Sequence, residues 1–279
     1  MKNPIFNRAR ARRGARYLSA IGLIGAAGCS SVLSSVSGGT EPEESPVPEI
    51  GSARALIVQM HDRYAGNWYR TLRFTQTNTF YTQSGGEQKS RWVENLSVPG
   101  RLRIDFEPLG SKSGLLILNN RVTTFDNGKR VDSRRSIQAI LTLTADVYAI
   151  PAAVTLRRLD SLQIDLDKFR ADRLEKRRVF VVGAEKGDLE SSQIWIDAER
   201  MLLLRLIQAE KRGERTIVTD TRVGDYRDVD GFPIAHEFVS MRDGKPYFRE
   251  QYEDVRVNAE LPAGIFDPAR WASVKPGET

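Results

Sequence analysis

The sequence is poor in the residues that most enzymes use for chemistry. It has one cysteine and two histidines among 279 residues, and the histidines, His61 and His236, are far apart along the chain. It contains no Gly-x-Ser-x-Gly motif, no phosphate-binding glycine loop and no Cys/His/Asp spacing typical of a metal centre. We therefore predict no catalytic residues, no metal ion and no cofactor, and a protein that is not an enzyme.

Most of the chain also lacks an excess of positive charge. The net charge of +6 comes from 42 basic and 36 acidic residues, and six of the basic residues lie within residues 1–28, where no acidic residue occurs. The rest of the chain therefore carries 36 basic and 36 acidic side chains. Nucleic-acid binding requires a clustered basic excess, so the sequence predicts no nucleic-acid partner.

The single cysteine, Cys29, directly follows a short apolar run. Basic residues precede this run, as in an export signal, and residues 18–28 are fewer than the roughly 20 apolar residues that span a bilayer. The stretch "AAGC" at 26–29 resembles the lipobox of bacterial lipoproteins. This resemblance implies cleavage before Cys29 and a lipid anchor on its side chain. An ordinary secretory signal with an incidental cysteine is the alternative.

Composition divides the chain into four segments. Residues 1–28 form the predicted signal peptide, and residues 29–50 are rich in Ser, Gly, Pro and Glu. A segment so poor in large apolar side chains buries too little to offset its ordering entropy, so we expect a flexible tether. Residues 51–272 have the length of one large domain, and residues 273–279 are expected to be a C-terminal tail.

Apolar periodicity predicts an α+β domain. Residues 52–66 show helical spacing with Ser52 as the candidate N-cap. The period then changes to two, which is typical of antiparallel strands with one apolar and one wet face. Turn signals such as "DNG" at 126–128 separate these strands. The apolar positions that alternate in this way are Leu72, Phe74, Leu102, Ile104, Phe106, Leu202, Leu204 and Leu206.

Helical spacing returns in a segment at 136–170, which carries Ile140 and Leu141. Pro151 divides it into two predicted helices. Because these helices must cover apolar surface, they either pack on the sheet as ordinary core or form a mobile lid over a cavity. A sheet with this many strands must curl, so we predict a strongly curved antiparallel sheet, a half-open barrel, with helices on its concave apolar side.

The order of these elements resembles the LolA/LolB-like lipoprotein carriers of bacterial envelopes. Four stretches carry the resemblance: "VFVVGAEKG", "QIWIDAERMLLLRL", "DYRDVDGFPIAHEF" and "YEDVRVNAELPAGIFDP". It covers about residues 52–268 and implies a half-open barrel whose interior accepts acyl chains of lipids or lipoproteins. The residues expected to line that interior are Leu72, Phe74, Leu102, Ile104, Phe106, Ile140, Leu141, Leu202, Leu204 and Leu206.

The resemblance implies a role in lipoprotein sorting or lipid transport. By resemblance to the sorting rules of bacterial lipoproteins, the expected lipid anchor with Ser30 after it implies the periplasmic side of the outer membrane, with the inner membrane left open. The same fold also occurs in envelope sensors, so the alternative is an interaction module that binds a membrane protein partner. The sequence does not separate a carrier from a sensor.

Overall fold

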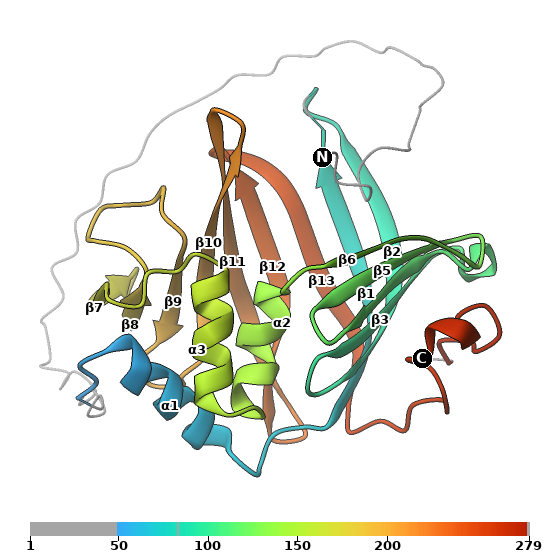
Figure 1. The fold of residues 1–279 in the computed structure, drawn as a ribbon, viewed down its shortest axis with the longest axis horizontal. Helices are drawn as coiled ribbons and strands as arrows, with labels where there is room; N and C mark the ends of the chain where they lie inside the picture. The colour runs from blue at the N-terminus through green and yellow to red at the C-terminus, as the bar shows by residue number, and fades with distance from the viewer. Residues whose placement is uncertain (1–48, 83, 278–279) are drawn as a thin grey trace, which may run out of the picture. The chain divides into compact units, whose positions relative to one another are not determined.

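Thirteen strands form one antiparallel sheet in the computed structural model, which describes residues 49–82 and 84–277 (Figure 1). The strand order is β6-β5-β4-β3-β2-β1-β13-β12-β11-β10-β9-β8-β7, so the chain closes the middle of the sheet by pairing β1 with β13. The strands are β1 (Thr71–Tyr81), β2 (Glu87–Ser97), β3 (Arg101–Phe106), β4 (Gly114–Leu118), β5 (Arg121–Asp126), β6 (Lys129–Arg135), β7 (Phe169–Leu174), β8 (Arg177–Val182), β9 (Gln193–Asp197), β10 (Leu203–Arg212), β11 (Arg215–Val229), β12 (Phe232–Arg242) and β13 (Lys245–Val257).

Tight turns set the register of three hairpins in the sheet. The hairpins β5-β6, β11-β12 and β12-β13 each turn through an Asn-Gly or Asp-Gly pair at 127–128, 230–231 and 243–244, and both residues of each pair have positive φ. This geometry matches the right-handed twist of the flanking strands and favours Asn, Asp and Gly. The predicted turns are therefore confirmed.

Three α-helices lie on one side of the sheet. They are α1 (Ala53–Tyr64), α2 (Ala139–Thr144) and α3 (Ala152–Ser161), and a 3₁₀ turn, η3 (Asp146–Tyr148), joins the last two. Ser52 caps α1 as predicted, because its hydroxyl accepts a hydrogen bond of 3.1 Å from the Ala55 amide. Pro151 stands at the N-cap of α3, where its fixed φ and missing N–H cost nothing.

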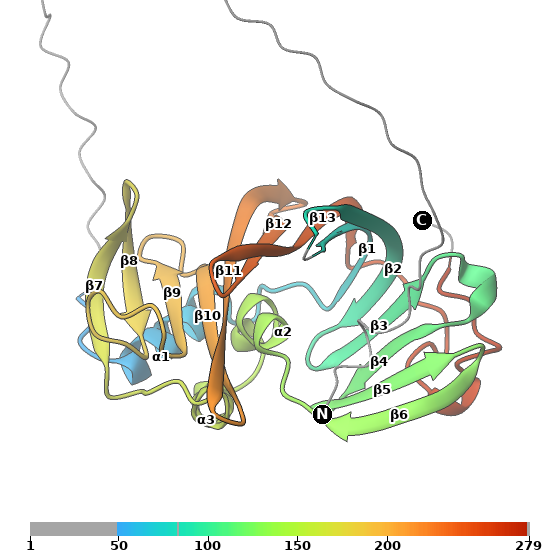
Figure 2. The same ribbon diagram turned by 90° about the horizontal axis from the view of Figure 1, so that it is seen from above.

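The sheet curves around the helices, which occupy its concave side (Figure 2). The helices share one apolar cluster with strands β8 to β12, and this cluster includes Leu56, Leu143, Leu159, Ile194 and Phe238. It contains no buried residue of β1 to β6. The helices therefore cover the concave face of one half of the sheet, and the predicted α+β class with a curved, unclosed antiparallel sheet is confirmed.

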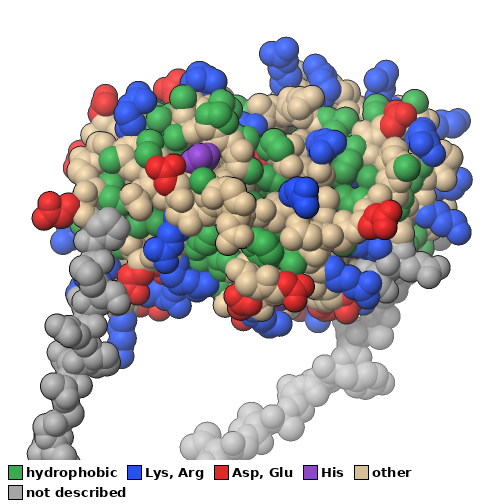
Figure 3. All heavy atoms as spheres, turned by 90° about the horizontal axis from the view of Figure 1, so that it is seen from below, with side chains coloured by type: hydrophobic (Ala, Val, Ile, Leu, Met, Phe, Trp, Pro, Cys, Tyr) green, Lys and Arg blue, Asp and Glu red, His purple; other side chains and the backbone are tan. Residues whose placement is uncertain are grey.

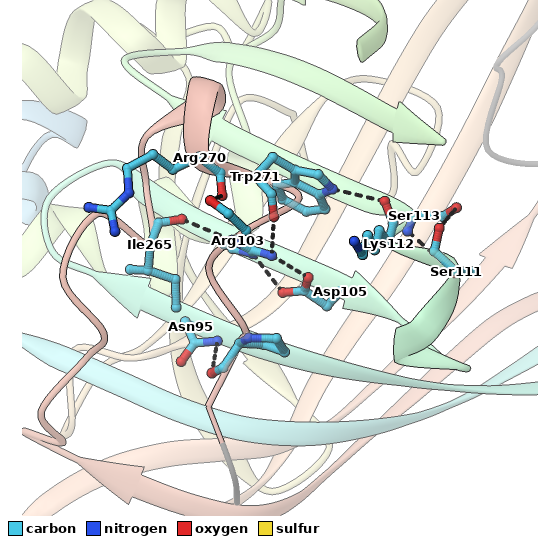
Figure 4. Close-up of polar contacts among 11 residues, drawn as sticks. Asn95, Arg103, Asp105, Ser111, Lys112, Ser113, Ile265, Arg270 and Trp271 are labelled. Carbon is cyan, nitrogen blue, oxygen red and sulfur yellow. Dashed lines mark hydrogen bonds and ion pairs between the residues drawn. The ribbon is translucent and has the colours of Figure 1, made fainter. Parts of the chain in front are cut away.

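The C-terminal segment covers the outer face of the other half (Figure 4). Trp271 stacks on Phe125 with ring centroids 4.3 Å apart, and the Arg103 guanidinium lies 4.0 Å above the Trp271 ring. Arg103 also donates two hydrogen bonds of 2.8 Å to Asp105 and one of 3.1 Å to the Trp271 carbonyl. Gly114 permits this approach, because a Cβ there would lie 3.0 Å from the Trp271 ring and also 2.0 Å from the Ile104 carbonyl oxygen.

The packing of the C-terminal segment corrects the expectation that the outer face of β3 is exposed to solvent. The outer face of β3, expected to be wet, is buried: Arg103 and Asp105 are 2% and 4% exposed because the C-terminal segment covers them. Within the expected tail, the Pro276 carbonyl accepts a hydrogen bond from Asn95. Cys29, the signal peptide and nearly all of the tether lie outside the described residues. Among those residues, no helix has the length and apolarity needed to cross a bilayer.

Candidate functional site: the concave face of β12, β13 and β1 to β3

A ribbon of aromatic rings crosses the concave face of five neighbouring strands. Tyr252 of β13 contacts Phe238 of β12 at 5.1 Å and stacks on Phe74 of β1 at 4.0 Å between centroids. Further along the same strands, Phe80 contacts Phe248, and Trp92 contacts Phe106 at 4.9 Å. We call these seven residues the aromatic ribbon: Phe74, Phe80, Trp92, Phe106, Phe238, Phe248 and Tyr252.

Strand register places five of the predicted lining residues on the same face as the ribbon. Directly opposed residues of antiparallel neighbours point to the same side of a sheet. Leu72 lies opposite Leu96, which lies opposite Leu102, while Trp92 lies opposite Phe106. Because side chains alternate along each strand, the following predicted residues share the concave face: Leu72, Phe74, Leu102, Ile104 and Phe106.

The ribbon is only partly covered. Phe74 is 3% exposed, but Phe80, Trp92, Phe106, Phe248 and Tyr252 have intermediate exposure. Partly exposed aromatic rings gathered on a concave face are typical of an apolar binding surface rather than of a closed core.

The remaining predicted residues lie under the helices or on the other face. Leu202 and Leu206 belong to the helix-covered cluster, Ile140 packs against it, and Leu141 is buried. The inward placement predicted for Leu204 is wrong: it packs with Trp195 on the outer face. The cause is a β-bulge between Leu203 and Arg205, which interrupts the alternation: Leu203 and Leu206 both lie under the helices although they are three positions apart, and Leu204 between them faces outward.

Four polar side chains interrupt the aromatic ribbon, and the sequence analysis missed them. They are Gln76, Asn78, Glu94 and Glu250, of which the first three are at most 4% exposed. The signal is visible in the alternation: Glu94 stands between Trp92 and Leu96 in β2, and Glu250 stands between Phe248 and Tyr252 in β13. A carboxylate at an apolar position of a strand is therefore worth testing as a site residue.

Burial raises the pKa of both carboxyl groups. It raises the pKa of Glu250 from 4.5 to about 7. Burial also raises the pKa of Glu94 well above its usual value, and the charges of Glu250 and Asp105 raise it further. Tyr252 lies near both carboxyl groups. Burial raises the pKa of its hydroxyl, and the charges of Glu250 and Glu94 raise that pKa further.

A second aromatic group closes one end of the helix-covered half. Tyr64, Trp68 and Tyr148 pack with centroids 4.2 to 4.9 Å apart. The hydroxyls of Tyr64, Tyr148 and Tyr226 donate to the carbonyls of residues 200, 201 and 203, which fixes the turn between β9 and β10.

Viewed from below, hydrophobic side chains lie across the middle of the molecular surface, among scattered charges (Figure 3).

Each histidine contacts a polar group close to it in the sequence. His61 lies on α1 beside Asp62 at 2.9 Å, and the His236 ring contacts the Ile234 carbonyl. Within residues 49–82 and 84–277, no three His, Cys, Asp or Glu side chains come together in a way that could hold a metal ion.

Comparison with solved structures identifies the fold. The chain is similar to a domain from Vibrio parahaemolyticus described as an outer membrane lipoprotein-sorting protein, with a TM-score of 0.53 and 13% identity over 79% of this chain and 98% of that one. A LolA superfamily protein from Nitrosomonas europaea matches with a TM-score of 0.51 and 11% identity, over 78% of this chain and 98% of that one.

A DUF1329 family protein from Desulfovibrio piger matches with a TM-score of 0.53 and 12% identity, over 78% of this chain and 97% of that one. No family model and no curated protein sequence matches the chain. At identities of 11 to 13% the likeness shows the fold alone, and that fold is the LolA-like one that the sequence analysis predicted.

Proposed function

We propose that this LolA-like chain binds acyl chains of lipids or lipoproteins on the concave face of its sheet and acts in lipid or lipoprotein transport at the bacterial cell envelope. The observation that carries the proposal is the part of the aromatic ribbon that lies outside the helix-covered cluster: Phe80, Trp92, Phe106 and Phe248 are partly exposed, whereas Phe238 belongs to that cluster and Tyr252 packs against it. Each CH₂ group transferred from water to such a surface contributes about 0.8 kcal/mol. Affinity then comes from apolar area and requires no catalytic chemistry.

The proposal includes an anchor and a location. Cys29 would be the lipidated first residue of the mature chain, held on the periplasmic side of the outer membrane. Two or more acyl chains hold a protein stably on a bilayer, whereas one does not. Membrane fractionation of the native chain and of Cys29→Ala tests the anchor, with the N-terminal mass measured in parallel. Equal membrane recovery with identical mass would contradict it.

A ligand-binding experiment with a matched control tests the acyl site. Displacement of a fluorescent fatty-acid probe by decanol is measured on the full chain carrying Cys29→Ala, so that no covalent lipid competes. Phe106→Ala removes a half-buried ring from the concave face, and we expect roughly tenfold weaker decanol binding, since burial of such a ring contributes about 1.5 kcal/mol or more.

Tyr247→Ala supplies the control. Tyr247 is also a half-buried aromatic residue of the sheet, but it alternates with Phe248 and so points to the other face, where Arg242 lies over its ring. We expect its decanol affinity to match that of the parent protein. If the parent binds no decanol, the acyl site does not exist and the partner-binding alternative gains weight. If both variants lose affinity equally, the concave face is not the site.

A further inference from the structure

Two carboxyl groups lie within the proposed acyl site with no partner of opposite charge. Glu94 lies opposite Phe74 of β1 and Ile104 of β3, and Glu250 lies opposite Asn78 of β1 and Phe238 of β12. Register therefore places both carboxyl groups on the concave face. In the described part of the chain, no hydrogen bond and no opposite charge acts on either carboxyl group.

The neighbouring elements offer these groups no positive charge. Glu94 is 4% exposed, and the charged groups that act on it are Glu250 and Asp105, which are both acidic. The arginines of the adjacent strands lie on the outer face: Arg103 pairs with Asp105, and Arg249 pairs with Glu237. A fold normally pairs or hydrogen-bonds a buried acid. The packing of the chain therefore does not explain Glu94, which is buried, or the partly exposed Glu250 on the same apolar face.

Aromatic rings surround the same two carboxyl groups. Phe248 and Tyr252 flank Glu250 along β13, Trp92 is two residues from Glu94 along β2, and Tyr252 stacks on Phe74 between the two acids. The faces of aromatic rings attract cations. Carboxylates and ring faces together are the groups that bind an ammonium ion, which has donors on every side and no acceptor.

We propose that the concave face selects amphiphiles whose polar head carries a protonated amine, with the amine held by Glu94, Glu250 and the adjacent rings. The acyl chain of the ligand would lie over Leu102, Ile104 and Phe106. This inference rests on the proposed function, because it names the ligand class of the same surface. A bound cation favours the ionised form of both carboxyl groups.

Three ligands of equal chain length isolate the role of the head group. Binding of decylamine, decanol and decanoate is measured at pH 7.5 by displacement of a neutral fluorescent acyl probe from the full chain carrying Cys29→Ala. A hydrogen bond to a charged group corresponds to about tenfold to a hundredfold in affinity. We therefore expect decylamine to bind at least tenfold more tightly than decanol, and decanoate to bind more weakly than both.

Substitutions then connect this preference to the two acids. Glutamine has the shape of a protonated glutamate, so Glu94→Gln with Glu250→Gln should fold, as circular dichroism would verify, and should bind decylamine no more tightly than decanol. Glu253→Gln is the matched control, because Glu253 lies on the same strand but bonds to Thr77 on the outer face. It should keep the full preference. If the double variant does not fold, each single variant must lower the preference at least threefold.

The outcomes separate this inference from the proposed function. Equal binding of all three ligands to the parent protein, or a preference that survives in the double variant, refutes amine selection but leaves acyl binding standing. Absence of binding for every ten-carbon ligand refutes both. Propylamine tests the source of the amine: we expect no measurable binding, whereas affinity equal to that of decylamine would show a site for free amines and contradict selection of amphiphiles.

Discussion

The free energy of unfolding should fall as the pH rises from 5 to 8, and replacing Glu250 by glutamine should make this fall smaller. Burial raises the pKa of Glu250 in the folded chain to about 7, from 4.5. Between these two values the folded state keeps the proton while the unfolded state releases it. Because the folded state binds more protons in this window, stability falls as the pH rises through it, and the full contribution is present only below about pH 4.5.

The magnitude follows from the size of the pKa shift. Each pKa unit corresponds to about 1.4 kcal/mol, so the rise from 4.5 to about 7 sets an upper limit of about 3.5 kcal/mol. The Glu250 side chain is partly exposed, which lets water screen some of this cost. We therefore expect the free energy of unfolding to fall by about 1 to 3 kcal/mol more in the native protein than in Glu250→Gln between pH 5 and pH 8.

Urea unfolding at the two pH values measures this difference directly. Glu94, Asp105 and Asp146 also have raised pKa values because of burial, but they are present in both proteins, so their contributions largely cancel. Glu253→Gln serves as the control and should behave as the native protein does. If Glu250→Gln loses as much stability as the native protein between pH 5 and pH 8, Glu250 is not a buried neutral acid.

Other expectations concern packing and motion. Trp271→Ala removes the ring that lies against Arg103 and should lower the free energy of unfolding by about 3 to 5 kcal/mol in denaturant titration; a loss below 1 kcal/mol would show that the C-terminal segment is not part of the folded domain. Gly114→Ala should cost at least about 2 kcal/mol because its Cβ meets backbone, whereas Gly110→Ala, with open space around it, should cost under 1. If the helical insertion is a lid, hydrogen exchange should be faster at 136–170 than at 193–207; equal protection would favour ordinary core packing.

The pattern of the sequence determined most of the architecture in advance. Alternation and turn residues predicted the hairpins, because Asn-Gly and Asp-Gly pairs accept the positive φ that a two-residue turn requires. The cap of α1 and the break at Pro151 follow from local chemistry in the same way. The curved sheet with helices on its concave side could be predicted because a wide sheet with one apolar face must be covered.

Long-range packing explains what the sequence analysis missed. Leu204 does not lie on the predicted face because β10 contains a bulge, and no residue of "MLLLRL" indicates that bulge. The alternation in β3 predicts that Arg103 is exposed to solvent, yet the C-terminal segment, about 170 positions later, buries it beneath Trp271. Glu94 and Glu250 reach one surface only when β1 pairs with β13, so their proximity could not be seen in either strand alone.

Photolabelling tests the central claim most directly. A fatty acid that carries a diazirine on its chain would be bound to the full chain carrying Cys29→Ala and irradiated, and the modified residues would be mapped by mass spectrometry. Acyl binding on the concave face predicts adducts on the aromatic ribbon, with Trp92 and Phe106 prominent, and their loss when unlabelled fatty acid competes. Adducts confined to the outer face, around Trp195 or Trp271, or adducts that do not compete, would contradict it.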